Sequence, residues 1–176
     1  AGALSEDDLS PQRMAPPDRQ VIAQATGALQ PHRVLREAAA RALARRAGAA
    51  LPPVPCGPGA EGERLAREAR SRGLDGLVEF SLEAVGLAAG ADRDTYGVFV
   101  QVRARAFDGR DGSLRYERVL SYGPGRPVEG LPRAEIYSIE MLAMDEARAY
   151  RHLATEAMRA VARRLAADPA SPLQVQ

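Results

Sequence analysis

The fold is decided by residues 96–122, YGVFVQVRARAFDGRDGSLRYERVLSY, in which two runs of alternating side chains flank two Asp-Gly pairs. Alternation with a period of two is typical of a half-buried β-strand, and Asp-Gly favours the turn of a hairpin. Even-numbered side chains in the first run are small and apolar, whereas the odd-numbered ones include arginine and glutamine. We therefore predict an antiparallel hairpin of strands 96–107 and 114–122 whose even face belongs to the core.

The register of this hairpin follows from charge and size. If even positions face even positions, small Ala104 lies near large Tyr116, and Glu117 lies opposite Arg103 or Arg105. The alternative register places one arginine opposite another, and like charges directly opposite each other destabilise a ladder. We therefore expect the first register.

The even face of the second strand carries Leu114, Tyr116, Leu120 and Tyr122, together with Arg118. Leu114 suits this face because it fills space beside small alanines. Arg118 does not suit a mainly apolar face, so we expect it to extend to solvent or to pair with a carboxylate.

The odd face of the first strand carries the candidate interaction residues. It is either exposed to water or covered by a partner or by another helix. Exposed aromatic side chains beside arginines are typical of protein interfaces. We therefore predict an interaction surface formed by Phe99, Arg103, Arg105 and Phe107.

The remaining periodicity predicts an α+β fold, in which an antiparallel sheet of three or more strands packs against about three helices. A third long strand is predicted over 76–87, with Val78, Phe80, Leu82 and Ala84 on one face. Residues 21–29 are expected to form a short first strand, and 139–144 an early helical turn. The helices are predicted over 31–47, 61–72 and 145–166.

A length of 176 residues suits one domain. Because residues 1–20 are polar and contain three prolines, we expect an extended or mobile N-terminal arm. The single α+β domain is predicted over 21–167, and residues 168–176 are expected to form a C-terminal tail.

All 24 basic residues are arginine. The codon bias of a GC-rich bacterial genome explains this composition better than selection for recognition does. The net charge of +1 offers no strong field for nucleic acid, and we expect none as a partner. One alternative stays open, nucleic-acid binding through the arginine-rich helix 31–47. No run of 18 apolar residues is present, so we expect no membrane span.

Motifs for catalysis or cofactor binding are weak. GPGAEG at 57–62 fits a dinucleotide fingerprint, but prolines replace the strand that must precede it. The alternative of a small-ligand or nucleotide site in the Gly/Pro-rich loop 49–62 stays open. His32 and His152 have no partner at metal-ligand spacing, and Cys56 is alone. We expect no catalytic residue, no cofactor and no metal.

The order of elements resembles the periplasmic α/β domains of bacterial envelope lipoproteins: the curli-secretion lipoprotein, the penicillin-binding-protein activators and the N-terminal domain of the Tol translocation protein. The likeness covers about residues 60–167. It depends on Gly73 and Asp75 after a helix, on a hairpin signature from Val100 to Asp108 with Gly112, and on an acidic start to the last helix at Asp145 and Glu146.

This resemblance implies a non-catalytic accessory domain, outside the cytoplasm, that docks onto envelope machinery. It implies a periplasmic location, with membrane association only through a lipid anchor upstream of the given chain. The expected partners are envelope proteins or further copies of the chain.

Overall fold

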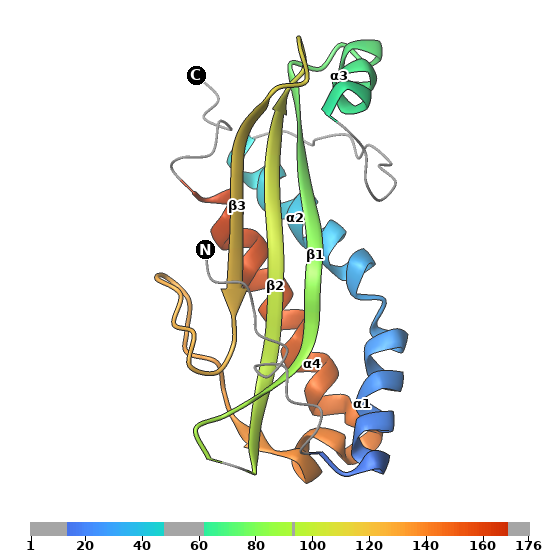
Figure 1. The fold of residues 1–176 in the computed structure, drawn as a ribbon, viewed down its shortest axis with the longest axis vertical. Helices are drawn as coiled ribbons and strands as arrows, with labels where there is room; N and C mark the ends of the chain where they lie inside the picture. Colours follow the sequence, from blue (N-terminus) through green and yellow to red (C-terminus); the bar gives the residue numbers. More distant parts are fainter. Residues whose placement is uncertain (1–13, 48–61, 93, 169–176) are drawn as a thin grey trace.

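Three long antiparallel strands lie in front of the helices in the computed structural model, which describes residues 14–47, 62–92 and 94–168 (Figure 1). Helices α1, α2 and α4 pack on one side of the sheet, and α3 lies at one end of it (Figure 1). The elements in chain order are α1 (Pro16–Leu29), α2 (Pro31–Ala47), α3 (Gly62–Ser71), β1 (Gly76–Ala89), β2 (Thr95–Asp108), β3 (Leu114–Tyr122), β4 (Tyr137–Ser138) and α4 (Ile139–Ala166).

The sheet has the strand order β1-β2-β3, and the two-residue β4 pairs with the start of β2. Even positions of β2 face even positions of β3, with Ala106 opposite Tyr116 and Val102 opposite Leu120. This is the predicted register, and the predicted α+β class is confirmed.

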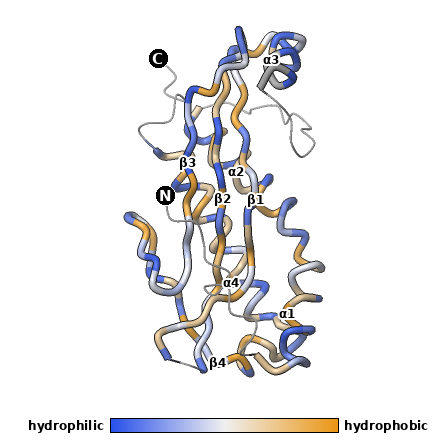
Figure 2. Tube along the Cα trace, in the orientation of Figure 1, coloured by the Kyte–Doolittle hydropathy of each residue, from blue (hydrophilic) through white to orange (hydrophobic). Residues whose placement is uncertain are grey.

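The core lies between α4 and what we call the inner face of the sheet, which carries the even-numbered side chains of β2. Val100 and Val102 are fully buried there, and hydrophobic and hydrophilic residues are interspersed along β2 (Figure 2). On α4, the predicted apolar stripe supplies Tyr150 and Met158, both at 0% exposure. The hydroxyls of Tyr150 and Thr26 lie 2.7 Å apart, which ties α4 to α1. Helix α2 has the predicted bounds.

The strand predicted over 21–29 is wrong, because these residues belong to α1. A short apolar run does not distinguish a strand from a helix, and tertiary packing decides. Here Ile22 and Ala25, three positions apart, are the buried residues of α1. Helix α1 begins at Pro16, inside the range expected for the arm, and residues 1–13 lie outside the described residues.

The prediction for Ala84 is also wrong. The strand pairing shifts between Leu82, opposite Val102, and Ala84, opposite Gln101. This β-bulge at Glu83 adds one residue to β1, so every later side chain changes face. Ala84 therefore joins the opposite side of the sheet from Leu82.

A second bulge corrects the expectation for Leu114. The register shifts between Ala106 and Phe107, so that Leu114 lies opposite Phe107. This pairing moves Leu114 off the inner face, and 49% of the residue is exposed.

The last helix starts earlier than residue 145, and its first part is the predicted early turn. A kink interrupts it: Asp145, Glu146 and Ala147 have left-handed backbone angles, with φ of 51° to 57°. Such angles cost roughly 1–2 kcal/mol for each residue with a side chain. The long regular part of α4 follows the kink, with the two acidic residues before it as the helix dipole prefers.

Candidate functional site on the outer face of the sheet

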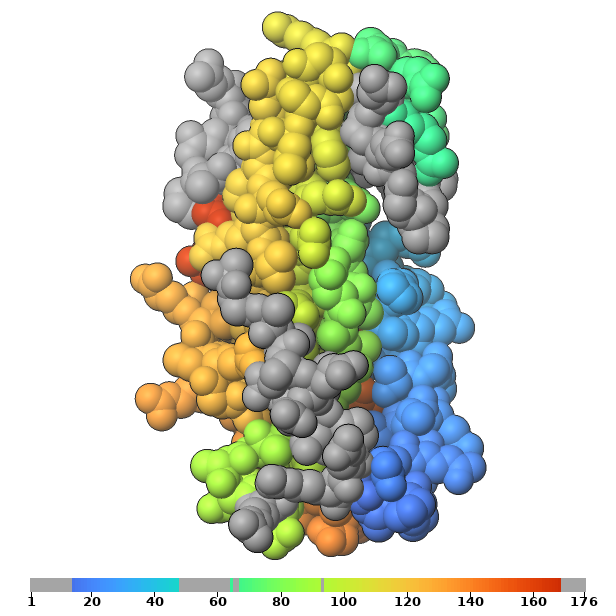
Figure 3. Space-filling model, in the orientation of Figure 1, coloured from blue at the N-terminus to red at the C-terminus, as the bar shows by residue number. Residues whose placement is uncertain are grey.

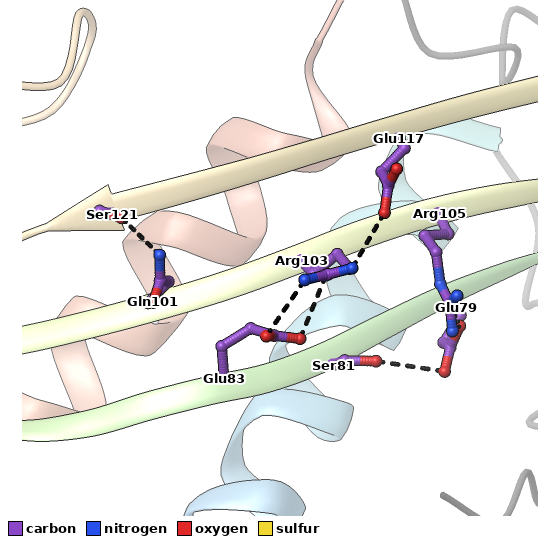
Figure 4. A network of polar contacts seen from close by, with 8 residues as sticks. All are labelled: Glu79, Ser81, Glu83, Gln101, Arg103, Arg105, Glu117 and Ser121. Atoms are coloured by element: carbon purple, nitrogen blue, oxygen red, sulfur yellow. Dashed lines mark hydrogen bonds and ion pairs between the residues drawn. The ribbon is translucent and has the colours of Figure 1, made fainter. Parts of the chain in front are cut away.

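The side of the sheet away from α4 carries a row of polar side chains, and we call it the outer face. It includes the odd-numbered side chains of β2 and their neighbours on β1 and β3. Figure 3 views the molecule from the same direction as Figure 1 and shows residues of all three strands at the surface. The row consists of Glu79, Ser81, Glu83, Gln101, Arg103, Arg105, Glu117 and Ser121 (Figure 4).

Arg103 lies at the centre of this row, between two carboxylates (Figure 4). Its Nη1 donates to Oε1 of Glu117 at 3.2 Å, and its Nη2 donates to Oε2 of Glu83 at 3.4 Å. The guanidinium therefore joins β1, β2 and β3. The expected proximity of Glu117 to the arginines is confirmed.

Arg105 forms the more buried ion pair of the row. Its Nε donates to Oε2 of Glu79 at 2.9 Å, and the side chains are 27% and 19% exposed. The Arg105 Cζ lies 5.4 Å from the centroid of the Phe107 ring, within cation–π range. Three carboxylates and two guanidiniums thus neutralise most of each other's charge on this face.

The expectation that Phe99 and Phe107 are exposed is wrong, since they are only 1% and 8% exposed. After β3 the chain folds back over Phe99: Arg126 lies over its ring at 5.6 Å, and a Cβ atom on Gly123 would come within 2.9 Å of the ring. Phe107 packs against Leu77 on β1. Of the four predicted interaction residues, the two arginines stay half-buried and reachable, and the two aromatics do not.

Two exposed apolar residues on β3 were not among the predicted interaction residues. Leu114 is 49% exposed and Val119 is 45% exposed. Val119 pairs with Arg103, so it lies directly beside the ion-pair row. Its odd number in the alternating pattern was the signal that could have identified it.

On the inner face, Arg118 pairs with a carboxylate, as its position predicts. It forms an ion pair with Asp168, which is 2% exposed, and the Tyr116 hydroxyl donates to Asp168 Oδ2 at 2.9 Å. Burial and the neighbouring Asp168 carboxylate raise the pKa of Tyr116 to about 12. Asp168 belongs to the predicted C-terminal tail, whose residues 169–176 lie outside the described residues. The sequence therefore predicts that Arg118 needs a partner, but not that Asp168 is this partner.

The other candidate sites are dispersed or lie outside the described residues. His32 and His152 are exposed on different helices. Within the described ranges, no group of three or more His, Cys, Asp and Glu side chains is arranged to hold a metal ion. Cys56 and the loop 49–61 are outside these ranges, and Gly62 begins α3.

Comparison with known proteins assigns the chain to no family, since no family model and no curated protein matches it. None of the described helices combines the length and the apolar character that crossing a bilayer requires.

Proposed function

We propose that this chain is a non-catalytic accessory domain that binds a protein partner in a bacterial cell-envelope assembly, through the outer face of β2 and β3. The observation that carries the proposal is that exposed Val119 pairs with half-buried Arg103, and that exposed Leu114 lies opposite Phe107, whose ring Arg105 contacts. Apolar anchors beside arginine, within a polar surround, are the composition that protein interfaces favour.

The strand edge adds a second element of recognition. In the described part of the chain, β3 pairs with β2 along one edge, and no strand pairs with its other edge, since the short β4 pairs with β2. An edge strand presents unpaired backbone N–H and C=O groups that an extended segment of a partner can bind. Val119 and Leu114 lie on this strand, so its backbone edge and these two side chains would form one binding surface.

The envelope location rests on the resemblance over residues 60–167. The observed order of a helix, a strand, a hairpin and a long final helix is compatible with that resemblance. A periplasmic position, with any lipid anchor upstream of Ala1, is part of the proposal.

Site-specific photo-cross-linking tests this proposal. A photoreactive residue is placed at position 119 of the full chain, which is expressed in a bacterium with a GC-rich genome. It should give a discrete adduct with one envelope protein. The same residue at position 136 is the matched control, because Ile136 is also 45% exposed but lies beside β4. The control should not give this adduct.

The identified partner then allows a binding measurement. Val119→Glu should weaken binding about tenfold or more, because it places a carboxylate where an apolar anchor is desolvated. Ile136→Glu should leave binding within about twofold. Equal effects of the two variants, or adducts only between copies of the chain, would contradict a heterologous partner on this face.

A further inference from the structure

Two neighbouring concavities lie on the helical side, away from the outer face. The larger, of about 480 Å³, runs along α4 beside the segment 130–135. The smaller, of about 380 Å³, lies where α2 and α4 end. Both include Arg163 and Ala167 in their lining, so they meet at this point of α4.

Three arginines, Arg45, Arg46 and Arg163, line the smaller concavity. The other residues that line it are Ala42, Ala166 and Ala167. Arg46 is held in place because its Nη1 donates to the carbonyl oxygens of Ala166 at 2.5 Å and Asp168 at 3.3 Å.

Among the described residues, no carboxylate forms an ion pair with these arginines, unlike those of the outer face. Across residues 14–47, 62–92 and 94–168, no carboxylate pairs with Arg45 or Arg163. The nearby Asp168 carboxylate is already bound by Arg118 and Tyr116. Like charges gathered around a concave surface repel one another, and an anion bound between them removes this repulsion.

The larger concavity is mainly apolar, and the charged residues Arg133, Glu135, Glu156 and Arg164 also line it. Leu153, Ala157 and Ala160 recur on one stripe of α4, opposite Leu131. The Nε of Arg164 donates to the Glu129 carbonyl at 2.9 Å and holds the neighbouring loop segment against the helix. At 1.5 Å per residue, the stripe from Leu153 to Arg163 is about 15 Å long, which matches a medium-length alkyl chain.

We propose that these two concavities form one binding site for a single-chain amphiphile with a phosphate head. The phosphate binds between Arg45, Arg46 and Arg163, whose planar forks match its oxygens. The alkyl chain lies along Leu153 and Ala160. This site is independent of the proposed protein-binding face, so either can fail without the other.

The combination of a cationic end and an apolar groove favours an amphiphile over nucleic acid. A strand of nucleic acid needs a longer row of cations and aromatic side chains for base stacking. The other arginines of α2 do not line the concavity. Arg41, for instance, is already paired with Glu37.

Titration with monodecyl phosphate, below its micelle concentration, tests the proposal on the full chain. Calorimetry gives the affinity, and amide shifts of Ala166 and Ala167 in NMR spectra give the location. The double variant Arg45→Ala/Arg163→Ala should weaken binding about tenfold or more. The control Arg33→Ala/Arg36→Ala removes the same charge from exposed positions of α2 and should change affinity less than about twofold.

A further variant separates the contribution of the phosphate head from that of the alkyl chain. Ala160→Leu, which fills the larger concavity, should weaken binding of monodecyl phosphate severalfold and leave the weaker binding of inorganic phosphate unchanged.

Three results would overturn the proposal. The first is an equal loss of affinity in the control double variant, which would indicate diffuse charge attraction. The second is tighter binding of a twelve-nucleotide RNA that depends on the same arginines. The third is binding to phosphatidylglycerol vesicles with no binding of the monomeric phosphate, which would place the headgroup on a membrane surface and not in the groove.

Discussion

The two faces of β2 solve different physical problems with neighbouring residues. On the inner face, Val100 and Val102 are fully buried, and burial of their apolar surface stabilises the fold. On the outer face, Arg103 and Arg105 stay 37% and 27% exposed and are neutralised by carboxylates on both flanking strands. The inner face therefore provides most of the stability, whereas the outer face contributes mainly to strand register, and its role in recognition is our proposal.

Arg118 shows what happens when a charge lies on the wrong face. An outer-face arginine pairs with partly exposed carboxylates on the flanking strands, as Arg103 does with Glu83 and Glu117. Arg118 instead needs one specific, almost fully buried partner, Asp168. A charge on the inner face is thus tolerated only because tertiary structure brings a counter-charge to it.

The largest expected effect separates the two faces directly. Val102→Asp buries an unpaired carboxylate and should destabilise the fold by more than about 4 kcal/mol, or prevent folding. Val119→Asp adds the same charge to the exposed side of the sheet and should change stability by less than about 0.5 kcal/mol. Urea denaturation followed by circular dichroism measures both, and similar values for the two variants would refute the assignment of faces.

A smaller effect is expected at the inner-face ion pair. Asp168→Asn leaves Arg118 without its counter-charge and should lower the free energy of unfolding by about 2 kcal/mol. This loss is smaller than for a fully buried ion pair, because the Arg118 side chain is 43% exposed. The matched control is Asp111→Asn in the hairpin turn, where the carboxylate is 59% exposed, so this variant should lose much less stability than Asp168→Asn. Equal losses of unfolding free energy would show that Asp168 has no special role.

The same cluster predicts a dependence on alkaline pH. The pKa of Tyr116 is raised to about 12, so the folded state keeps the phenol proton that the unfolded chain releases near its usual pKa of about 10. This stabilisation is complete below pH 10 and is lost as the pH rises towards 12. Unfolding free energy should therefore fall more steeply between pH 10 and 12 in the original protein than in Tyr116→Phe. An equal decrease of unfolding free energy with pH in the two proteins would argue against a raised pKa of Tyr116.

The smallest effect concerns the outer-face row. A double-mutant cycle on Arg105 and Glu79, with alanine at each position, should give a coupling energy of about 0.5–1 kcal/mol that decreases with added NaCl. The more exposed pair Arg41 and Glu37, at 59% and 51%, should give about 0.3 kcal/mol. A larger coupling for the helix pair would reverse the expected order.

Local periodicity was enough to predict the hairpin, the bounds of α2 and the pairing of even with even positions, because each depends on residues close in sequence. It also identified Arg118 as a residue in need of a partner. It misassigned residues 21–29, since a short apolar run satisfies helix and strand equally well. The bulge at Glu83 left no local signal either, and a single extra residue exchanged the faces of the rest of β1.

The alternation of side chains between 96 and 122 determined, by itself, that a two-faced hairpin would form. Only the tertiary structure decided what covers each face. It folded the segment after β3 over Phe99, brought Asp168 to Arg118 and exposed Leu114 and Val119. The physical reason is distance along the chain: the partners of Phe99 and Arg118 lie 27 and 50 positions away, and a local pattern contains no information about contacts of that separation.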